Sequence, residues 1–143
     1  MKTKLKDLKA WMDVIVPKLR EHLYLDGWLI TVRYRGEDKK SGAAMDIHTD
    51  DKYMYATINV YPGFLATFDR QSREMSGLDV VHELVHIFTD PLYKFAINRA
   101  CAPEDKFIED IRERSTQMAA LAIWRGLPTK FWLGEKKKRK VTR

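Results

Sequence analysis

Residues 82–86 read His-Glu-Leu-Val-His, and this pattern constrains the fold and the chemistry of the chain more than any other feature. Residues four apart on a helix lie on one face, about one turn apart. His82 and His86 can therefore bind one metal ion, while Glu83 reaches a water molecule on that ion. The flanking residues are apolar, so we expect a buried helix, in which two unliganded histidines would need other partners to offset their desolvation.

A third ligand is needed, because a catalytic zinc site typically takes three protein ligands and leaves the fourth position to water. Two carboxylates, Glu109 and Glu113, lie four residues apart on a later predicted helix, and either could reach the ion. We favour Glu113, because Thr116, Gln117 and Ala120 follow it and make a surface of modest size. Such a surface would let this helix approach the metal helix closely. Glu109 is instead followed by bulkier charged side chains.

Less specific interpretations exist for these side chains. The two histidines would then be core residues with ordinary partners, and the two glutamates would be solvated and paired with Arg112 or Arg114. Asp90 lies four residues beyond the second histidine, but Pro91 is expected to end the helix. Asp90 is therefore interpreted as a helix-end residue or a hydrogen-bond partner of an imidazole, with metal ligation as a minor alternative. Asp79 is expected to cap the helix rather than to bind metal.

The spacing of apolar residues divides the chain into helices, with spacings of three and four, and strands, with a period of two. Three strands followed by helices predict an α+β fold: an N-terminal helix, a small three-stranded, mostly antiparallel sheet, the metal-binding helix and a C-terminal helix. The other two histidines, His22 and His48, fall on a helix and a strand and are expected to be structural. The predicted elements are a helix from Thr3 to Asp26-Gly27, a strand over residues 28–34, a hairpin of Ala44–Thr49 and Tyr53–Tyr61, a metal helix from the capping box Ser76–Asp79 to Asp90-Pro91, a short helix over Leu92–Ala100 and a long helix from Pro103 to Gly126.

The length of 143 residues suits one domain, which we assign to residues 1–134, followed by a basic tail at residues 135–143. The net charge of +6 comes from the last eight residues, which hold six Lys and Arg and no acid. A basic nucleic-acid face spread over the fold is thereby excluded. The tail is expected to be a solvated terminus, with weak nucleic-acid contact as the alternative. The single cysteine, Cys101, and the lack of a signal peptide or long apolar run predict a cytoplasmic protein without a membrane segment.

Two segments carry a resemblance to a known family. Residues 80–88, which contain the His-Glu-Leu-Val-His pattern, and residues 113–122, which begin with Glu113, are similar to the zincin metallopeptidases with a glutamate third ligand. Among these, the chain most resembles small phage, prophage and mobile-element metallopeptidases related to the ImmA/IrrE group. In that group the ligand glutamate commonly precedes an amide or small residue four positions on and an alanine seven positions on, and Gln117 and Ala120 are similar. Residues 28–32 and 56–60 also look like the first and last sheet strands of that family.

The resemblance implies a minimal zincin-like fold and a gluzincin-like zinc peptidase that hydrolyses peptide bonds in a protein substrate. One Zn²⁺ per chain would be held by His82, His86 and Glu113. Glu83 would act as the general base on the metal-activated water.

The resemblance also implies that the substrate lies extended beside an edge strand, for which Tyr53–Tyr61 is our candidate. Tyr93 is a candidate donor to the oxyanion. The alternative function is a non-proteolytic metal-binding regulatory module whose basic tail contacts nucleic acid.

Overall fold

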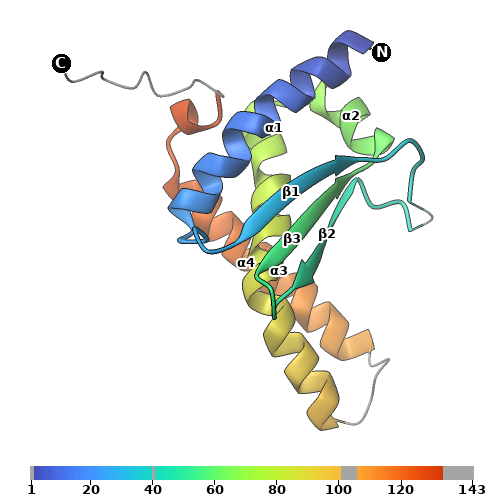
Figure 1. Cartoon of the computed structure of the whole chain (residues 1–143), viewed down its shortest axis with the longest axis vertical. Helices are drawn as coiled ribbons and strands as arrows, with labels where there is room; N and C mark the ends of the chain where they lie inside the picture. Colours follow the sequence, from blue (N-terminus) through green and yellow to red (C-terminus); the bar gives the residue numbers. More distant parts are fainter. Residues whose placement is uncertain (1, 40, 101–105, 134–143) are drawn as a thin grey trace, which may run out of the picture.

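The computed structural model describes residues 2–39, 41–100 and 106–133 and shows a three-stranded sheet with helices before and after it (Figure 1). The predicted α+β fold class is confirmed. The predicted tail, residues 135–143, and Cys101 lie outside the described residues. The elements are, in chain order, α1 (Lys2–His22), β1 (Leu29–Tyr34), β2 (Met45–Asp50), β3 (Tyr55–Val60), α2 (Pro62–Phe68), α3 (Arg73–Ala100), α4 (Lys106–Gly126) and a short 3-10 helix, η1 (Thr129–Phe131).

The sheet has the strand order β1-β3-β2, with β3 in the centre. β2 and β3 form the predicted antiparallel hairpin, but β1 pairs with β3 in parallel, so the sheet is mixed rather than mostly antiparallel. The prediction of Tyr53–Tyr61 as an edge strand is therefore wrong, because β3 is paired on both sides. The parallel return needs a long connection, and β2 lies within the connection between Tyr34 and Tyr55. β2 is a polar strand, as suits a sheet edge, and contains Asp46, His48 and Asp50.

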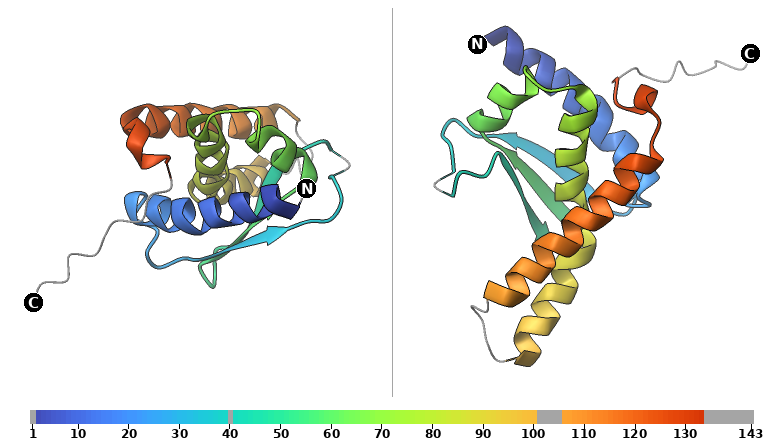
Figure 2. Two further views of the ribbon diagram at one scale, coloured as in Figure 1. Left: turned by 90° about the horizontal axis from the view of Figure 1, so that it is seen from above. Right: turned by 180° about the vertical axis from the view of Figure 1, so that it is seen from behind.

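The core lies between one face of the sheet and the helices α1 and α3. Ala56, Ile58 and Val60 alternate along β3 toward this face and are at most 2% exposed. The helices add fully buried side chains to the same cluster: Leu8, Met12, Ile15 and Leu19 from α1, and Val80, Val81 and Leu84 from α3. α4 crosses α3 on the side remote from the sheet (Figure 2). The opposite face of the sheet is polar, because the intervening positions of β3 are Thr57 and Asn59.

α3 is longer at both ends than the sequence predicted. It begins at Arg73, and Ser72 Oγ accepts the N–H of Met75 at 3.2 Å. The predicted capping box, Ser76–Asp79, therefore lies inside the helix, and Asp79 is not a cap. The helix also continues through Pro91 to Ala100, so the predicted short helix is its last part. Proline removes one backbone hydrogen bond, and the packing of α4 along α3 offsets this loss.

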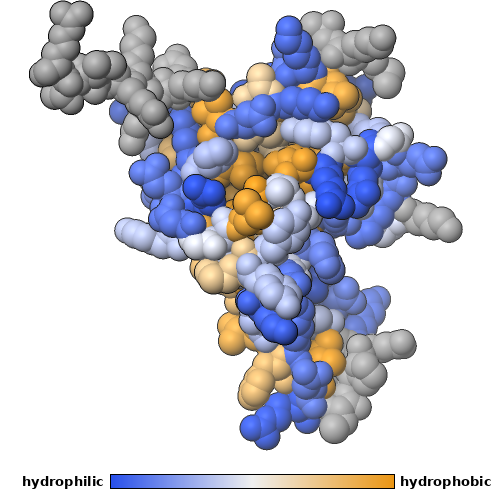
Figure 3. All heavy atoms as spheres, in the orientation of Figure 1, coloured by the Kyte–Doolittle hydropathy of each residue, from blue (hydrophilic) through white to orange (hydrophobic). Residues whose placement is uncertain are grey.

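The C-terminal part of α3 and the N-terminal part of α4 project from the body as a helical hairpin (Figure 1). Thr116 and Ala120 are fully buried where the two helices meet, and Thr89 Oγ1 lies 2.9 Å from Thr116 Oγ1. Hydrophobic side chains gather on the surface of this hairpin (Figure 3), among them Phe88, Leu92 and Phe95. Within the described part of the chain, no helix has the length and apolar character needed to cross a membrane.

The segment after α4 closes the core through Trp132, which is 1% exposed and whose carbonyl accepts the indole N–H of Trp11 at 2.9 Å. A Cβ added at Gly77 of α3 would lie 2.2 Å from Trp132 Cε3. We therefore expect Gly77→Ala to lower the free energy of unfolding by about 1–3 kcal/mol, because the buried indole has to move. Urea denaturation followed by circular dichroism measures this change.

Gly126→Ala is the matched control for that substitution. A Cβ at Gly126 would meet nothing within 4 Å, so the free energy of unfolding should change by less than about 1 kcal/mol. Equal losses of stability in the two variants would contradict the close packing of Trp132 on Gly77.

Candidate metal centre

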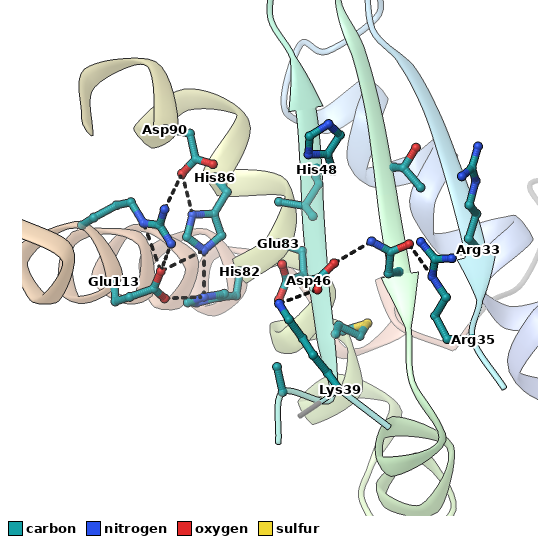
Figure 4. Close-up of a pocket in the computed structure, with 16 residues that line it drawn as sticks. Arg33, Arg35, Lys39, Asp46, His48, His82, Glu83, His86, Asp90 and Glu113 are labelled. Atoms are coloured by element: carbon teal, nitrogen blue, oxygen red, sulfur yellow. Dashed lines mark hydrogen bonds and ion pairs between the residues drawn. The ribbon is translucent and has the colours of Figure 1, made fainter. Parts of the chain in front are cut away.

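Three side chains from two helices converge at the point where α4 crosses α3. The group His82, His86 and Glu113 could hold a metal ion, since one ligand atom from each lies within 4.8 Å of the others. His82 Nε2 and His86 Nε2 are 3.2 Å apart. Glu113 Oε2 lies 3.4 Å from His82 Nε2, and Glu113 Oε1 lies 3.6 Å from His86 Nε2. The helical spacing of the histidines therefore brings both ring nitrogens to one point, and α4 brings the carboxylate to the same point (Figure 4).

These separations bring one nitrogen of each imidazole and the carboxylate of Glu113 within reach of a single ion. Bonds of roughly 2.0–2.1 Å to a tetrahedral ion place its ligand atoms about 3.3 Å apart. The separation of 3.2 Å between the two Nε2 atoms lies close to this value, and each Nε2 atom lies 3.4 or 3.6 Å from one of the two carboxylate oxygens of Glu113. Two imidazoles and one carboxylate are also a common catalytic donor set, in which one position stays open. The residues present thus fit a bound divalent ion.

The outer nitrogens of both imidazoles are held by oxygen acceptors. His82 Nδ1–H donates to Gln117 Oε1 at 2.9 Å, and His86 Nδ1–H donates to Asp90 Oδ1 at 3.0 Å. With its proton on Nδ1, the neutral form of each imidazole has the Nε2 lone pair available for a cation. This contact confirms the interpretation of Asp90 as a hydrogen-bond partner of an imidazole, and the alternative of a helix-end residue is wrong, because α3 continues to Ala100.

Glu113 is fixed from its other side by Arg112. The Arg112 guanidinium donates to Glu113 Oε1, and it also lies 3.8 Å from Asp90 and stacks over the ring of Tyr93. The hydrogen bond from His82, together with the contact with Arg112, lowers the pKa of Glu113 to about 2. The carboxylate therefore stays ionised, as a metal ligand must be. From the sequence, pairing of Glu113 with Arg112 was an alternative to metal binding. In the structure the carboxylate of Glu113 contacts both Arg112 and the two histidines.

Glu83 lies between the three-residue group and strand β2 (Figure 4). Its side chain is buried, and this burial raises the pKa of Glu83 to about 7, against the opposing influence of the two histidines. A carboxyl group whose pKa lies near neutrality can both accept and return a proton. The position of Glu83 beside His82 is the one that the sequence pattern predicted.

The three-residue group and Glu83 line one end of a pocket of ≈ 740 Å³ that extends over the polar face of the sheet. Beside Glu83, Asp46 of β2 accepts hydrogen bonds from Lys39, Asn59 and Tyr61 at 2.7, 2.6 and 2.8 Å. Burial alone would raise the pKa of Asp46, but these donors lower it. Asp46 is therefore an ionised floor residue of the pocket. Arg33, Arg35 and His48 line its remaining wall.

The other side chains considered from the sequence lie elsewhere or at the rim. Glu109 is exposed and is not part of the three-residue group. His22 is exposed on α1, and His48 lines the pocket on β2 without joining the group. Asp79 accepts a hydrogen bond from Gln71 at 3.1 Å. Tyr93 stacks on Arg112 and does not line the pocket.

Sequence reasoning missed Lys39, Asp46, Arg33 and Arg35 as pocket residues. Arg33 and Asp46 lie on the predicted strands and Arg35 and Lys39 on the loop between them, but the nearness of these residues to α3 depends on the strand order. No model of a known family, no curated protein and no solved structure matches this chain.

Proposed function

We propose that this chain is a zinc-dependent peptidase of the zincin type that hydrolyses peptide bonds in a protein or peptide substrate. One observation carries the proposal: a buried carboxyl group, Glu83, lies beside a convergent group of two imidazoles and one carboxylate whose ligand atoms lie within 4.8 Å of one another. The same group favours zinc over harder cations such as magnesium, because two of the three donors are imidazole nitrogens.

The chemistry divides between the ion and the chain. A bound divalent ion would polarise the scissile carbonyl and lower the pKa of a coordinated water. Glu83 accepts the proton of the attacking water and returns it to the leaving amine. Gln117 and Asp90 hold the imidazole rings in orientation, and Arg112 holds the carboxylate of Glu113.

The substrate backbone is proposed to pair with β2. β2 is the edge strand beside α3, and it replaces Tyr53–Tyr61 in this role because β3 lies in the centre of the sheet. An extended peptide can add to such an edge through main-chain hydrogen bonds. The scissile bond would then lie between β2 and the metal-binding group, within reach of Glu83.

A peptide-library digest tests the proposal. The full chain, loaded with zinc, is incubated with a mixture of peptides, and new termini are identified by mass spectrometry. We expect cleavage that stops when a chelator removes the ion and returns when zinc is added. A protein that binds metal stoichiometrically but cleaves nothing would contradict the peptidase function and favour the non-proteolytic metal-binding module.

A further inference from the structure

The polar face of the sheet forms a floor that extends away from the metal centre. In register across the three strands, Arg33 of β1 lies opposite Asn59 of β3, which lies opposite Asp46 of β2. Thr57 and Asn59 are 5% and 7% exposed, although the helices α1 and α3 pack on the other face. The side chains of the neighbouring strands cover them. Figure 4 shows this floor between the metal-binding group at one end and Arg33 and Arg35 at the other.

Three of the four acidic side chains that line this pocket are paired with basic side chains. Asp46 is paired with Lys39 at 2.7 Å, Asp90 contacts His86, and Glu113 is held by Arg112. Glu83, the fourth acid, lies at the end of the pocket next to the histidines, away from Arg33 and Arg35 (Figure 4). None of these carboxylates forms an ion pair with Arg33 or Arg35 at the far end of the pocket.

Arg33 and Arg35 are both exposed and lie two residues apart, so they project from the same face of the sheet. Arg35 Nε donates to the Asn59 side chain at 2.9 Å, which fixes the guanidinium and leaves its terminal nitrogens as donors. Arg33 lies near the hydroxyl of Tyr55. Within the described part of the chain, no carboxylate is within ion-pair distance of either arginine. Two such guanidinium groups on one wall match the geometry of carboxylate groups.

We infer that Arg33 and Arg35 form a subsite for carboxylate groups of the substrate, so that the protein selects acidic peptides. This inference rests on the proposed function and names its substrate class. β1 lies two strand spacings from β2, roughly 10 Å across the polar face of the sheet, so a substrate carboxylate has to extend over this face, away from the main chain at β2, to reach the arginines. The source of the carboxylates is either Asp and Glu side chains or the C-terminal carboxylate.

Peptide binding tests the inference without requiring hydrolysis. The zinc-loaded full chain with Glu83→Gln is titrated with labelled ten-residue peptides, and fluorescence anisotropy gives the dissociation constants. One peptide alternates Ser and Glu and has blocked ends, a second alternates Ser and Gln with blocked ends, and a third is the Ser-Gln peptide with a free C-terminus. We expect the first, the third or both to bind about tenfold more tightly than the second, the effect of gaining charge-assisted hydrogen bonds. The first peptide reports side-chain carboxylates, and the third reports the terminal carboxylate.

Two double variants test whether the preference for carboxylate-bearing peptides depends on Arg33 and Arg35. In Arg33→Gln/Arg35→Gln the preference for carboxylate should disappear, and in Arg33→Lys/Arg35→Lys most of it should remain. The control Arg70→Gln/Arg125→Gln removes the same charge from exposed positions outside the pocket and should keep the full preference. Unchanged zinc content and circular dichroism establish that each variant is folded.

Equal binding of all three peptides, or a preference that survives Arg33→Gln/Arg35→Gln, would overturn the inference. A ten-nucleotide single-stranded DNA that binds more tightly than the acidic peptides and needs both arginines would replace it with a nucleic-acid site. The proposed function fails separately, since it requires cleavage in the library digest. If the protein cleaves peptides without preferring acidic ones, it is a peptidase in which Arg33 and Arg35 do not bind substrate carboxylates. If acidic peptides bind through the two arginines but nothing is cleaved, the pocket is a binding site without peptidase activity.

Discussion

Glu83→Gln is expected to lower the rate of peptide hydrolysis by about 10²–10⁴-fold while the protein keeps its metal, because glutamine cannot accept the proton of the attacking water. The substitution keeps the size of a side chain that is almost fully buried, so the fold should persist. Cleavage of a peptide found in the library digest gives the rate, and elemental analysis of the same sample gives the metal content.

Glu109→Gln is the control for this prediction. It makes the same chemical change at an exposed position of α4 that is not part of the three-residue group, and the rate should not change. A Glu83→Gln protein that hydrolyses the peptide at the wild-type rate would contradict the role of Glu83 as general base. That result would not contradict metal binding by the three-residue group.

Glu113→Ala is expected to weaken zinc binding by more than about a hundredfold. Loss of an outer hydrogen-bond partner of a metal ligand costs 10- to 100-fold in affinity, and loss of the ligand itself should cost more. The substitution also removes the carboxylate that contacts both Arg112 and the two histidines, so that, of its ion pairs in the described part of the chain, Arg112 keeps only the one with Asp90. Competition with a fluorescent zinc chelator measures the affinity.

Glu109→Ala provides the comparison for Glu113→Ala, because it removes a carboxylate from the same helix. Zinc affinity should stay within about twofold of the wild type, since Glu109 is exposed and outside the group. The reverse order of affinities would make Glu109 the third ligand and would contradict the arrangement of α4 against α3.

The centre of the site could be predicted from the sequence because its determinants are local. The spacing of His82 and His86 by four residues follows from helix geometry alone. The position of Glu113 follows from Thr116 and Ala120, whose small side chains are fully buried where α4 meets α3. Local spacing and residue size thus bring the three side chains together before any long-range pairing is known.

The strand order could not be predicted in the same way. β1 has the alternation expected of a strand, but alternation does not say whether it pairs with β2 or β3, or in which direction. The parallel pairing of β1 with β3 leaves β2 as the edge beside α3 and brings Arg33 and Arg35 to the pocket. The pocket wall therefore depends on tertiary contacts rather than on any motif.

The end of the metal helix was also predicted wrongly, for a related reason. Pro91 is a strong local signal for helix termination, yet α3 continues to Ala100 because α4 packs along it. This continuation keeps Asp90 within the helix, four residues from His86, where its carboxylate accepts a hydrogen bond from the imidazole.

Metal content tests the central claim most directly. Purified wild-type protein is analysed by inductively coupled plasma mass spectrometry beside His82→Ala/His86→Ala and beside His22→Ala/His48→Ala, which removes two histidines from outside the group. The account predicts about one zinc per chain in the wild type and in the second variant, and none in the first. A folded wild-type protein that holds no metal even after zinc is supplied, or a His82→Ala/His86→Ala variant that retains it, would contradict the metal centre and the peptidase proposal built on it.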